Sequence, residues 1–286
     1  MRKHHNDHFY QSADALTLFY RTYGERNDRL PVVCLPGLTR NSRDFRALAQ
    51  HLTPDWWVVC PDLRGRGLSA HDPNHHNYVP ATYVKDVIAL LDELDIERAI
   101  FIGTSLGGIV SMAIVATNAT RVAAVVLNDI GPEIDPAGLE RIRTYVGKQT
   151  PVTNWNEAMA QARETHGATA PDLDHARWLD YARNVYREDA DGIPQLDMDP
   201  KIGDASREAA PTPADPWALW QPMADVPTLV LRGETSDILS TATLQRMQEE
   251  KPDLMTATIP NRGHAPLLDE PASRRAIDQF LEMVGT

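Results

Sequence analysis

Short, fully apolar runs alternate with longer amphipathic ones along most of this chain. LPVVCL (30–35) and WWVVC (56–60) are rich in β-branched and aromatic residues, as is typical of strands buried on both faces of a parallel sheet. Residues 41–52 and 83–94 instead carry apolar side chains at helical spacing. The alternation predicts a doubly wound, mostly parallel α/β sheet with helices on both faces.

The same alternation continues to residue 128 and resumes after residue 226. Residues 8–23 contain two alternating runs around Ser12-Ala13-Asp14, which predicts an antiparallel hairpin. Further strands are predicted at 98–103, 123–128, 227–233 and 255–259, and further helices at 105–118, 241–250 and 272–283. Both halves therefore contribute to one α/β core, made of residues 1–130 and 226–286.

Residues 131–225 show no convincing buried strand. Helical patterns occur at 138–146, 155–165 and 173–186, and residues 204–222 are rich in Pro, Ala and Asp. We therefore expect residues 131–225 to form an all-helical insertion that caps the core.

Composition excludes several classes of partner. The net charge of −12, without a compensating cluster of Lys and Arg, disfavours nucleic acid and anionic membrane surfaces. No apolar stretch is long enough to span a membrane, and no apolar segment follows the basic N-terminus, so we expect a cytoplasmic protein. Cys34 and Cys60 lie inside apolar runs and are predicted to be buried free thiols. The expected partner is a small molecule.

The segment GTSLGG (103–108) carries the first chemical signal. It places Ser105 between glycines, where a buried strand ends and a helix begins. Gly-x-Ser-x-Gly in this setting is the sequence form of a nucleophile elbow, a tight turn that exposes a serine hydroxyl at the edge of the sheet. The alternative is a glycine-rich turn in which Ser105 caps the helix.

A serine becomes a useful nucleophile only when a base removes its proton, and that base needs an orienting carboxylate. The loop after the strand at 255–259 supplies His264, and the loop after the strand at 227–233 supplies Asp237. The order Ser, Asp, His is the expected one. Asp129, just after the strand at 123–128, is the competing candidate for the acid.

These pieces together resemble the α/β-hydrolase superfamily over nearly the whole chain. The matching segments are GTSLGG, LPGL (35–38), PDLRGRGLS (61–69), LRGETSD (231–237) and RGHAPLLDEP (262–271). The resemblance implies an eight-stranded sheet with a helical cap, Ser105 as nucleophile, His264 as base and Asp237 as acid.

It also implies an oxyanion hole built from two backbone N–H groups, those of Leu38 and Leu106. Leu106 lies at a helix N-terminus, which favours a developing negative charge. Many relatives carry His-Gly where this chain has Pro36-Gly37, so we expect the loop to be supported differently here.

Other residues have weaker assignments. Asp62 and Arg64 are expected to form a structural loop in which the arginine pairs with a carboxylate. The aromatic residues of the insertion are mostly expected to pack, with Tyr145, Trp155 and Trp178 as candidates for the substrate pocket. His75 and His76 are expected to be solvated, and no metal site or organic cofactor is expected.

The predicted activity is hydrolysis of a small ester, lactone or related acyl compound through an acyl-enzyme intermediate. The serine nucleophile argues against dehalogenase and epoxide-hydrolase relatives, which use aspartate. The alternatives are a C–C bond hydrolase of ring-fission products, a perhydrolase, and a ligand-binding receptor with vestigial activity. The sequence leaves the substrate and the oligomeric state open.

Overall fold

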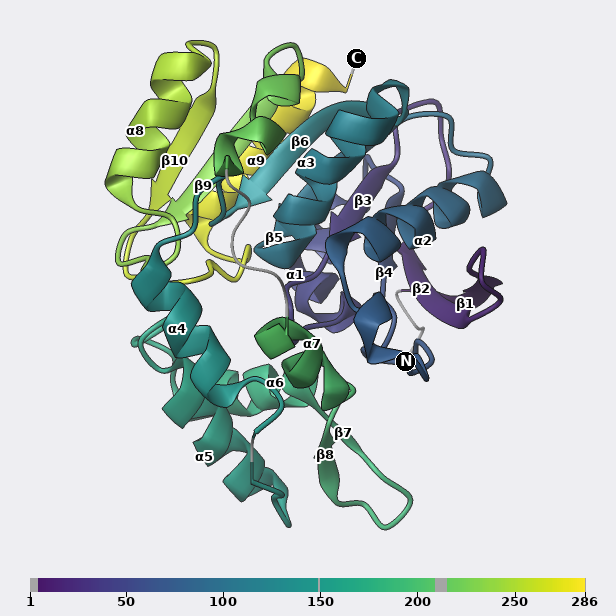
Figure 1. The fold of residues 1–286 in the computed structure, drawn as a ribbon, viewed down its shortest axis with the longest axis vertical. Helices are drawn as coiled ribbons and strands as arrows, with labels where there is room; N and C mark the ends of the chain where they lie inside the picture. The colour runs from purple at the N-terminus through teal and green to yellow at the C-terminus, as the bar shows by residue number, and fades with distance from the viewer. Residues whose placement is uncertain (1–4, 149, 209–214, 286) are drawn as a thin grey trace.

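A twisted sheet of eight strands forms the centre of the computed structural model, which describes residues 5–148, 150–208 and 215–285 (Figure 1). The strand order is β1-β2-β4-β3-β5-β6-β9-β10, and the pairs β1–β2 and β2–β4 are antiparallel while the others are parallel. The strands are β1 (Asn6–Gln11), β2 (Thr17–Tyr23), β3 (Val32–Leu35), β4 (Val58–Pro61), β5 (Ala99–Thr104), β6 (Val122–Asn128), β9 (Thr228–Gly233) and β10 (Met255–Ile259). This architecture confirms the predicted fold class.

Helices cover both faces of this sheet. They are α1 (Arg46–Leu52), α2 (Pro80–Glu93), α3 (Leu106–Asn118), α8 (Thr241–Glu250) and α9 (Pro271–Val284), with short 3₁₀ segments η1 (Ser42–Phe45), η2 (His75–Asn77), η3 (Ala119–Arg121), η4 (Pro216–Leu219) and η5 (Gln221–Met223). Within the described ranges, no helix is both long and apolar enough to cross a membrane.

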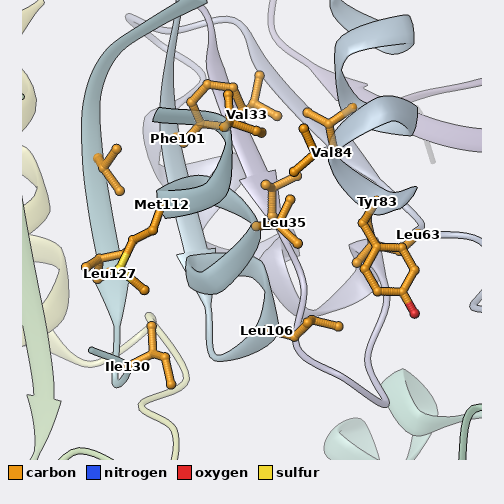
Figure 2. Close-up of a cluster of buried hydrophobic side chains, with 14 of the residues drawn as sticks. Val33, Leu35, Leu63, Tyr83, Val84, Phe101, Leu106, Met112, Leu127 and Ile130 are labelled. Atoms are coloured by element: carbon orange, nitrogen blue, oxygen red, sulfur yellow. The ribbon is translucent and has the colours of Figure 1, made fainter. Parts of the chain in front are cut away.

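Alternate side chains of the buried strands enter two different cores. Val33 and Leu35 of β3 face α2 and α3, in the apolar cluster that Figure 2 shows. The neighbouring Cys34 faces the opposite side, which α1 and α9 cover with residues such as Phe280. Because each strand is buried on both faces, its sequence is a continuous apolar run. Cys34 and Cys60 are buried free thiols, as predicted.

The segment between β6 and β9 forms a separate layer beyond the carboxyl ends of the parallel strands (Figure 1). It contains α4 (Pro136–Tyr145), α5 (Trp155–His166), α6 (His175–Val185), α7 (Lys201–Glu208) and a hairpin of β7 (Tyr186–Glu188) and β8 (Pro194–Leu196). The expectation that this insertion is all-helical is therefore wrong. Its two strands have only three residues each, too few to produce a recognisable alternating pattern.

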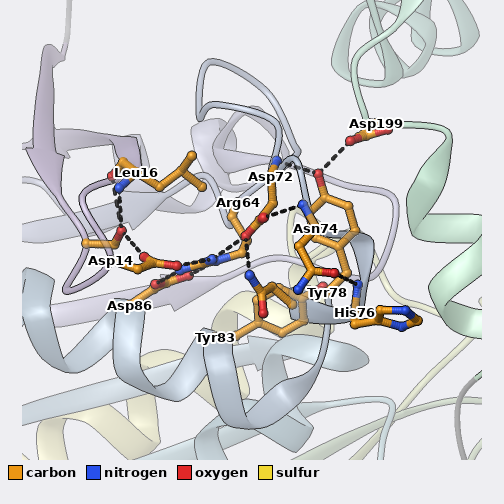
Figure 3. A network of polar contacts seen from close by, with 12 residues as sticks. Asp14, Leu16, Arg64, Asp72, Asn74, His76, Tyr78, Tyr83, Asp86 and Asp199 are labelled. Carbon is orange, nitrogen blue, oxygen red and sulfur yellow. Dashed lines mark hydrogen bonds and ion pairs between the residues drawn. The ribbon is translucent and has the colours of Figure 1, made fainter.

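A buried polar network supports the loop that follows β4 (Figure 3). Arg64 donates to Asp86, Asp72 and Asp14, which confirms that it pairs with carboxylates. Such a guanidinium is tolerated in the interior because it is paired and hydrogen-bonded. Tyr78 extends the network to the cap, since its hydroxyl donates to Asp199 over 2.6 Å.

Candidate active site

Ser105 occupies a strained turn at the edge of the sheet. β5 ends at Thr104 and α3 begins at Leu106, and Ser105 between them has φ 51° and ψ −114°. A non-glycine residue in this region is unfavourable, and such strain is concentrated at functional sites. The turn also needs small neighbours, because a Cβ added at Gly107 would lie 2.0 Å from the Leu35 carbonyl oxygen.

His264 connects Ser105 to a buried carboxylate. Its Nε2 lies 2.9 Å from Ser105 Oγ, and its Nδ1 lies 2.8 Å from Asp129 Oδ2. The carboxylate accepts from Nδ1–H, so the network assigns Nε2 as the acceptor of the serine proton. The Asp129 side chain is fully buried, and it also accepts from the Gly233 N–H (2.7 Å) and from Ser236 Oγ (2.6 Å).

The prediction that Asp237 orients His264 is wrong in this structure. Asp237 instead forms a two-point ion pair with Arg141 of α4, at 2.5 and 2.9 Å. Burial works against its ionisation, but the Arg141 guanidinium outweighs this effect and holds the pKa of Asp237 below its ordinary value. The competing candidate, Asp129, is the residue that contacts His264.

The loop after β9 explains why Asp237 faces the cap. Ser236 Oγ donates to Asp129 and also accepts from the N–H groups of Ile238 and Leu239, at 3.2 and 3.1 Å. These bonds turn Ser236 toward the sheet, while the adjacent Asp237 reaches α4. Sequence reasoning did not find the role of Ser236, because a serine in a polar loop gives no signal of its partner.

The loop that carries His264 is held from two sides. From the core, Asn128 Nδ2 donates to the Pro266 carbonyl over 2.9 Å. From the cap, Thr169 Oγ1 donates to the His264 carbonyl, and the Gly263 N–H donates to the Thr169 carbonyl, both over 2.8 Å. Thr169 is therefore a second residue that the sequence did not reveal, since its partner is 95 residues away along the chain.

The two predicted oxyanion amides belong to the residue after Ser105 and to the residue after Gly37. Leu106 is the first residue of α3, so its N–H has no acceptor within the helix. Leu38 follows Gly37, where an added Cβ would lie 3.8 Å from the Ser105 Cβ. Arg66 supports this loop, because its Nε donates to the Leu38 carbonyl over 2.9 Å.

A cavity of about 390 Å³ opens at Ser105 between the core and the cap. Ser105, His264 and Leu38 line it from the core, and Tyr145, His166 and Tyr181 line it from the cap. Of the three predicted pocket residues, only Tyr145 is found in its wall. Within the described ranges, Trp155 and Trp178 are not lining residues: the Trp155 Nε1–H donates to Glu188 and Trp178 is buried.

Three rings of the cap, those of Tyr145, His166 and Tyr181, pack together in the cavity wall. His166 contacts Tyr145 and Tyr181, with ring centroids 5.5 Å apart in each case. Burial, followed by the charges of Arg40 and Arg141, lowers the pKa of His166 to about 3. His166 is therefore uncharged at neutral pH, and burial raises the pKa of Tyr181 to about 12.

One further group of candidate metal ligands lies outside this cavity. Within the described ranges, His75, His76 and Glu208 are the residues whose ligand atoms converge, all within 4.8 Å of one another. His75 Nε2 lies 2.8 Å from Glu208 Oε2, so His75 has a cap partner where simple solvation was expected.

The comparisons with known proteins identify the family. The family model for the alpha/beta hydrolase fold matches residues 31–271. The chain belongs to this family. The 3-hydroxybutyrate-oligomer hydrolase of Cupriavidus necator is 31% identical over 268 residues, which cover 91% of each chain.

Two other matches extend the family likeness. A crystal structure of an alpha/beta hydrolase from Novosphingobium aromaticivorans has a TM-score of 0.93 and 45% identity, covering 99% of this chain and 100% of that one. The 2-(acetamidomethylene)succinate hydrolase of Mesorhizobium japonicum is 25% identical over 232 residues, covering 80% of this chain and 79% of that protein. Family membership and these relatives support assignment of the chain as a hydrolase.

Proposed function

We propose that this α/β hydrolase cleaves a small ester or lactone with Ser105 as the nucleophile. The observation that carries the proposal is the continuous chain from Ser105 Oγ through His264 to the buried Asp129, at 2.9 and 2.8 Å. Ser105 and His264 line the active-site cavity, and Leu38 lines it as well. A hydroxyl, a base and an orienting carboxylate in this order are the groups that acyl transfer needs.

The first half of the proposed reaction acylates Ser105. His264 Nε2 takes the serine proton while Oγ attacks the carbonyl carbon, and the N–H groups of Leu38 and Leu106 stabilise the oxyanion. The protonated His264 then gives its proton to the leaving alkoxide. Asp129 stabilises the imidazolium and keeps the ring in the required orientation.

Water completes the cycle. His264 removes a proton from a water molecule, which attacks the acyl carbon, and collapse of the second tetrahedral intermediate returns the serine proton and releases the acid. For the substrate, the names of the relatives suggest a class: one acts on 3-hydroxybutyrate oligomers and another on 2-(acetamidomethylene)succinate. Because the units of a 3-hydroxybutyrate oligomer are joined by ester bonds, oxygen esters of short hydroxy acids are the first candidates for this chain.

A substrate panel tests the proposal directly. Wild-type protein is incubated with 4-nitrophenyl acetate and butyrate, short lactones, 3-hydroxybutyrate dimers and ring-fission dienes, with and without hydrogen peroxide. We expect hydrolysis of at least one ester or lactone to fall by about 10³-fold or more in Ser105→Ala. The matched control Ser206→Ala removes a hydroxyl from α7 and should retain the wild-type rate.

The other outcomes separate the alternative functions. Turnover of dienes alone would indicate a C–C bond hydrolase, and faster product formation with peroxide than with water would indicate a perhydrolase. Saturable binding of a panel compound without Ser105-dependent turnover would indicate a receptor.

A further inference from the structure

We propose that His75, His76 and Glu208 form a binding site for a divalent transition-metal ion of the Zn²⁺ type, at the boundary between the core and the cap. Within the described ranges, none of the three lines the cavity at Ser105, and the inference does not depend on the activity proposed there. It is carried by three ligand atoms, from η2 of the core and α7 of the cap, that converge at distances suited to one ion.

The three ligand atoms lie close together. Glu208 Oε2 is 2.8 Å from His75 Nε2 and 3.7 Å from His76 Nδ1, and all three atoms are within 4.8 Å of one another. Tetrahedral bonds of about 2.0–2.2 Å to Zn²⁺ separate neighbouring ligand atoms by about 3.3–3.6 Å. Because the two distances from Glu208 lie on either side of this value, small rotations of the side chains bring the atoms onto one ion.

The residue types favour a transition metal over Mg²⁺ or Ca²⁺. Imidazole nitrogens and a carboxylate are typical Zn²⁺ ligands, and a site with three protein ligands leaves one position for water. Mg²⁺ and Ca²⁺ prefer sets of oxygen ligands, and these three residues supply a single carboxylate. A bound ion would replace the hydrogen bond between His75 and Glu208 with a metal bond to each residue.

Other contacts hold the two ligand-bearing elements in place. In the core, Asn74 caps η2, since its Oδ1 accepts from the His76 N–H over 3.2 Å (Figure 3). In the cap, Asp199 accepts from the N–H of Lys201, the first residue of α7, over 2.9 Å. Tyr78 joins the two elements, because its hydroxyl donates to Asp199 over 2.6 Å. Since η2 and α7 are already held together, an ion does not have to order them, and this lowers the entropic cost of binding.

Solvent access and the charges on α7 are compatible with a bound cation. The side chains of His76 and Glu208 are 69% and 55% exposed, so an ion can reach them from solvent. Arg207 donates to Asp204 over 2.6 Å, and Lys201 lies at the opposite end of the helix from Glu208. Within the described ranges, neither cation of α7 pairs with Glu208, whose carboxylate is therefore available to a metal ion.

Zinc binding to the whole chain, prepared without an affinity tag and treated with EDTA, tests the site. In calorimetric titration with ZnCl₂, the wild type should bind one more ion per chain than the double variant with His75→Gln and His76→Gln. Glu208→Gln keeps the shape of the side chain but removes its charge, so the affinity of this additional site should fall by at least about tenfold. MgCl₂ should produce no such difference between the proteins.

His51→Gln is the matched control. His51 Nε2 also contacts an exposed carboxylate, that of Asp278 at 2.9 Å, but among the described residues no third ligand converges there. This variant should keep the additional Zn²⁺ ion. Equal binding by the wild type and the double variant would overturn the site. Binding that is lost in the double variant but unchanged in Glu208→Gln would overturn the link between core and cap.

Thermal unfolding provides a second readout and shows whether each variant is folded before metal is added. An ion that binds only the folded chain stabilises it, so ZnCl₂ should raise the Tm of the wild type more than that of Glu208→Gln. Equal shifts in these two proteins would also overturn the site. Ser105→Ala should respond to ZnCl₂ as the wild type does, which separates this result from the outcome of the hydrolase assays.

Discussion

Two neighbouring loops place an aspartate at the same edge of the sheet, and they use it in opposite ways. Asp129 directly follows β6, has φ 57°, and donates its own N–H to the Leu231 carbonyl of β9. Asp237 lies four residues beyond the end of β9 and reaches outward to Arg141. The first side chain is fully buried and the second is 39% exposed.

The difference shows what an orienting acid requires. The Asp129 carboxylate accepts three hydrogen bonds, from the Gly233 N–H, Ser236 Oγ and His264 Nδ1. Its orientation is therefore fixed, and it is shielded from solvent. Asp237 faces a fixed cation on the cap and is partly solvated. One aspartate is therefore suited to a catalytic network, and the other to joining the core to the cap.

The largest expected effect comes from replacing the two acids in parallel. Asp129→Asn should lower kcat/KM for the best ester by about 10³–10⁴-fold, because the neutral amide no longer fixes the histidine tautomer or stabilises the imidazolium. Asp237→Asn, the matched control, should cost less than about tenfold. Steady-state kinetics on both variants measure these losses. An equal or larger loss of kcat/KM in Asp237→Asn would show that Asp129 is not the acid that orients His264.

A smaller effect is expected at the contact between the cap and the loop that carries His264. Thr169→Val keeps the shape of the side chain but removes the 2.8 Å hydrogen bond to the His264 carbonyl. Loss of one buried hydrogen bond costs about 1 kcal/mol, so kcat should fall about five- to tenfold with little change in KM. Thr169→Ser should recover most of the rate.

The control for Thr169 is Thr165→Val, which removes a hydroxyl that bonds only within α5. If Thr165→Val lowers kcat as much as Thr169→Val, the effect belongs to cap stability and not to the position of His264.

The core could be predicted from the sequence because its strands are buried on both faces and its helices are amphipathic. Ser105 and His264 were found for the same reason: each lies in a loop at the end of a recognisable strand. The choice between Asp129 and Asp237 could not be made, because it depends on how Ser236 turns its loop. That contact joins residues 107 positions apart.

The cap was the least predictable part of the molecule. The helices predicted at 138–146, 155–165 and 173–186 correspond to α4, α5 and α6, but α7 was not predicted. The three-residue strands of the hairpin carry too little pattern to detect. The pocket residues were also only partly found. Tyr145 and Trp155 are both aromatic residues of cap helices, and only the packing of those helices decides that Tyr145 faces the cavity.

A modest effect is expected from the pair that joins Asp237 to the cap. Arg141 and Asp237 are each more than a third exposed, so their interaction should stabilise the protein by no more than about 1 kcal/mol. A double-mutant cycle with Arg141→Met and Asp237→Asn, followed by urea unfolding, measures this coupling. It should weaken in 0.5 M salt, and a salt-independent coupling would show that the pair acts through packing.

The smallest expected effect is a change of stability with pH that arises from the buried His166 of the cap. Because the pKa of His166 is about 3 in the folded protein and about 6.5 in an unfolded chain, the unfolded state binds more protons below pH 6.5. Stability should therefore decrease as the pH falls through this range, by less than about 1 kcal/mol between pH 7 and pH 6. His166→Gln removes this term, so its urea midpoint should change less than that of the wild type over the same interval. Identical pH dependence in the two proteins would mean that His166 becomes protonated in the folded state as readily as in the unfolded one, despite its burial and the charges of Arg40 and Arg141.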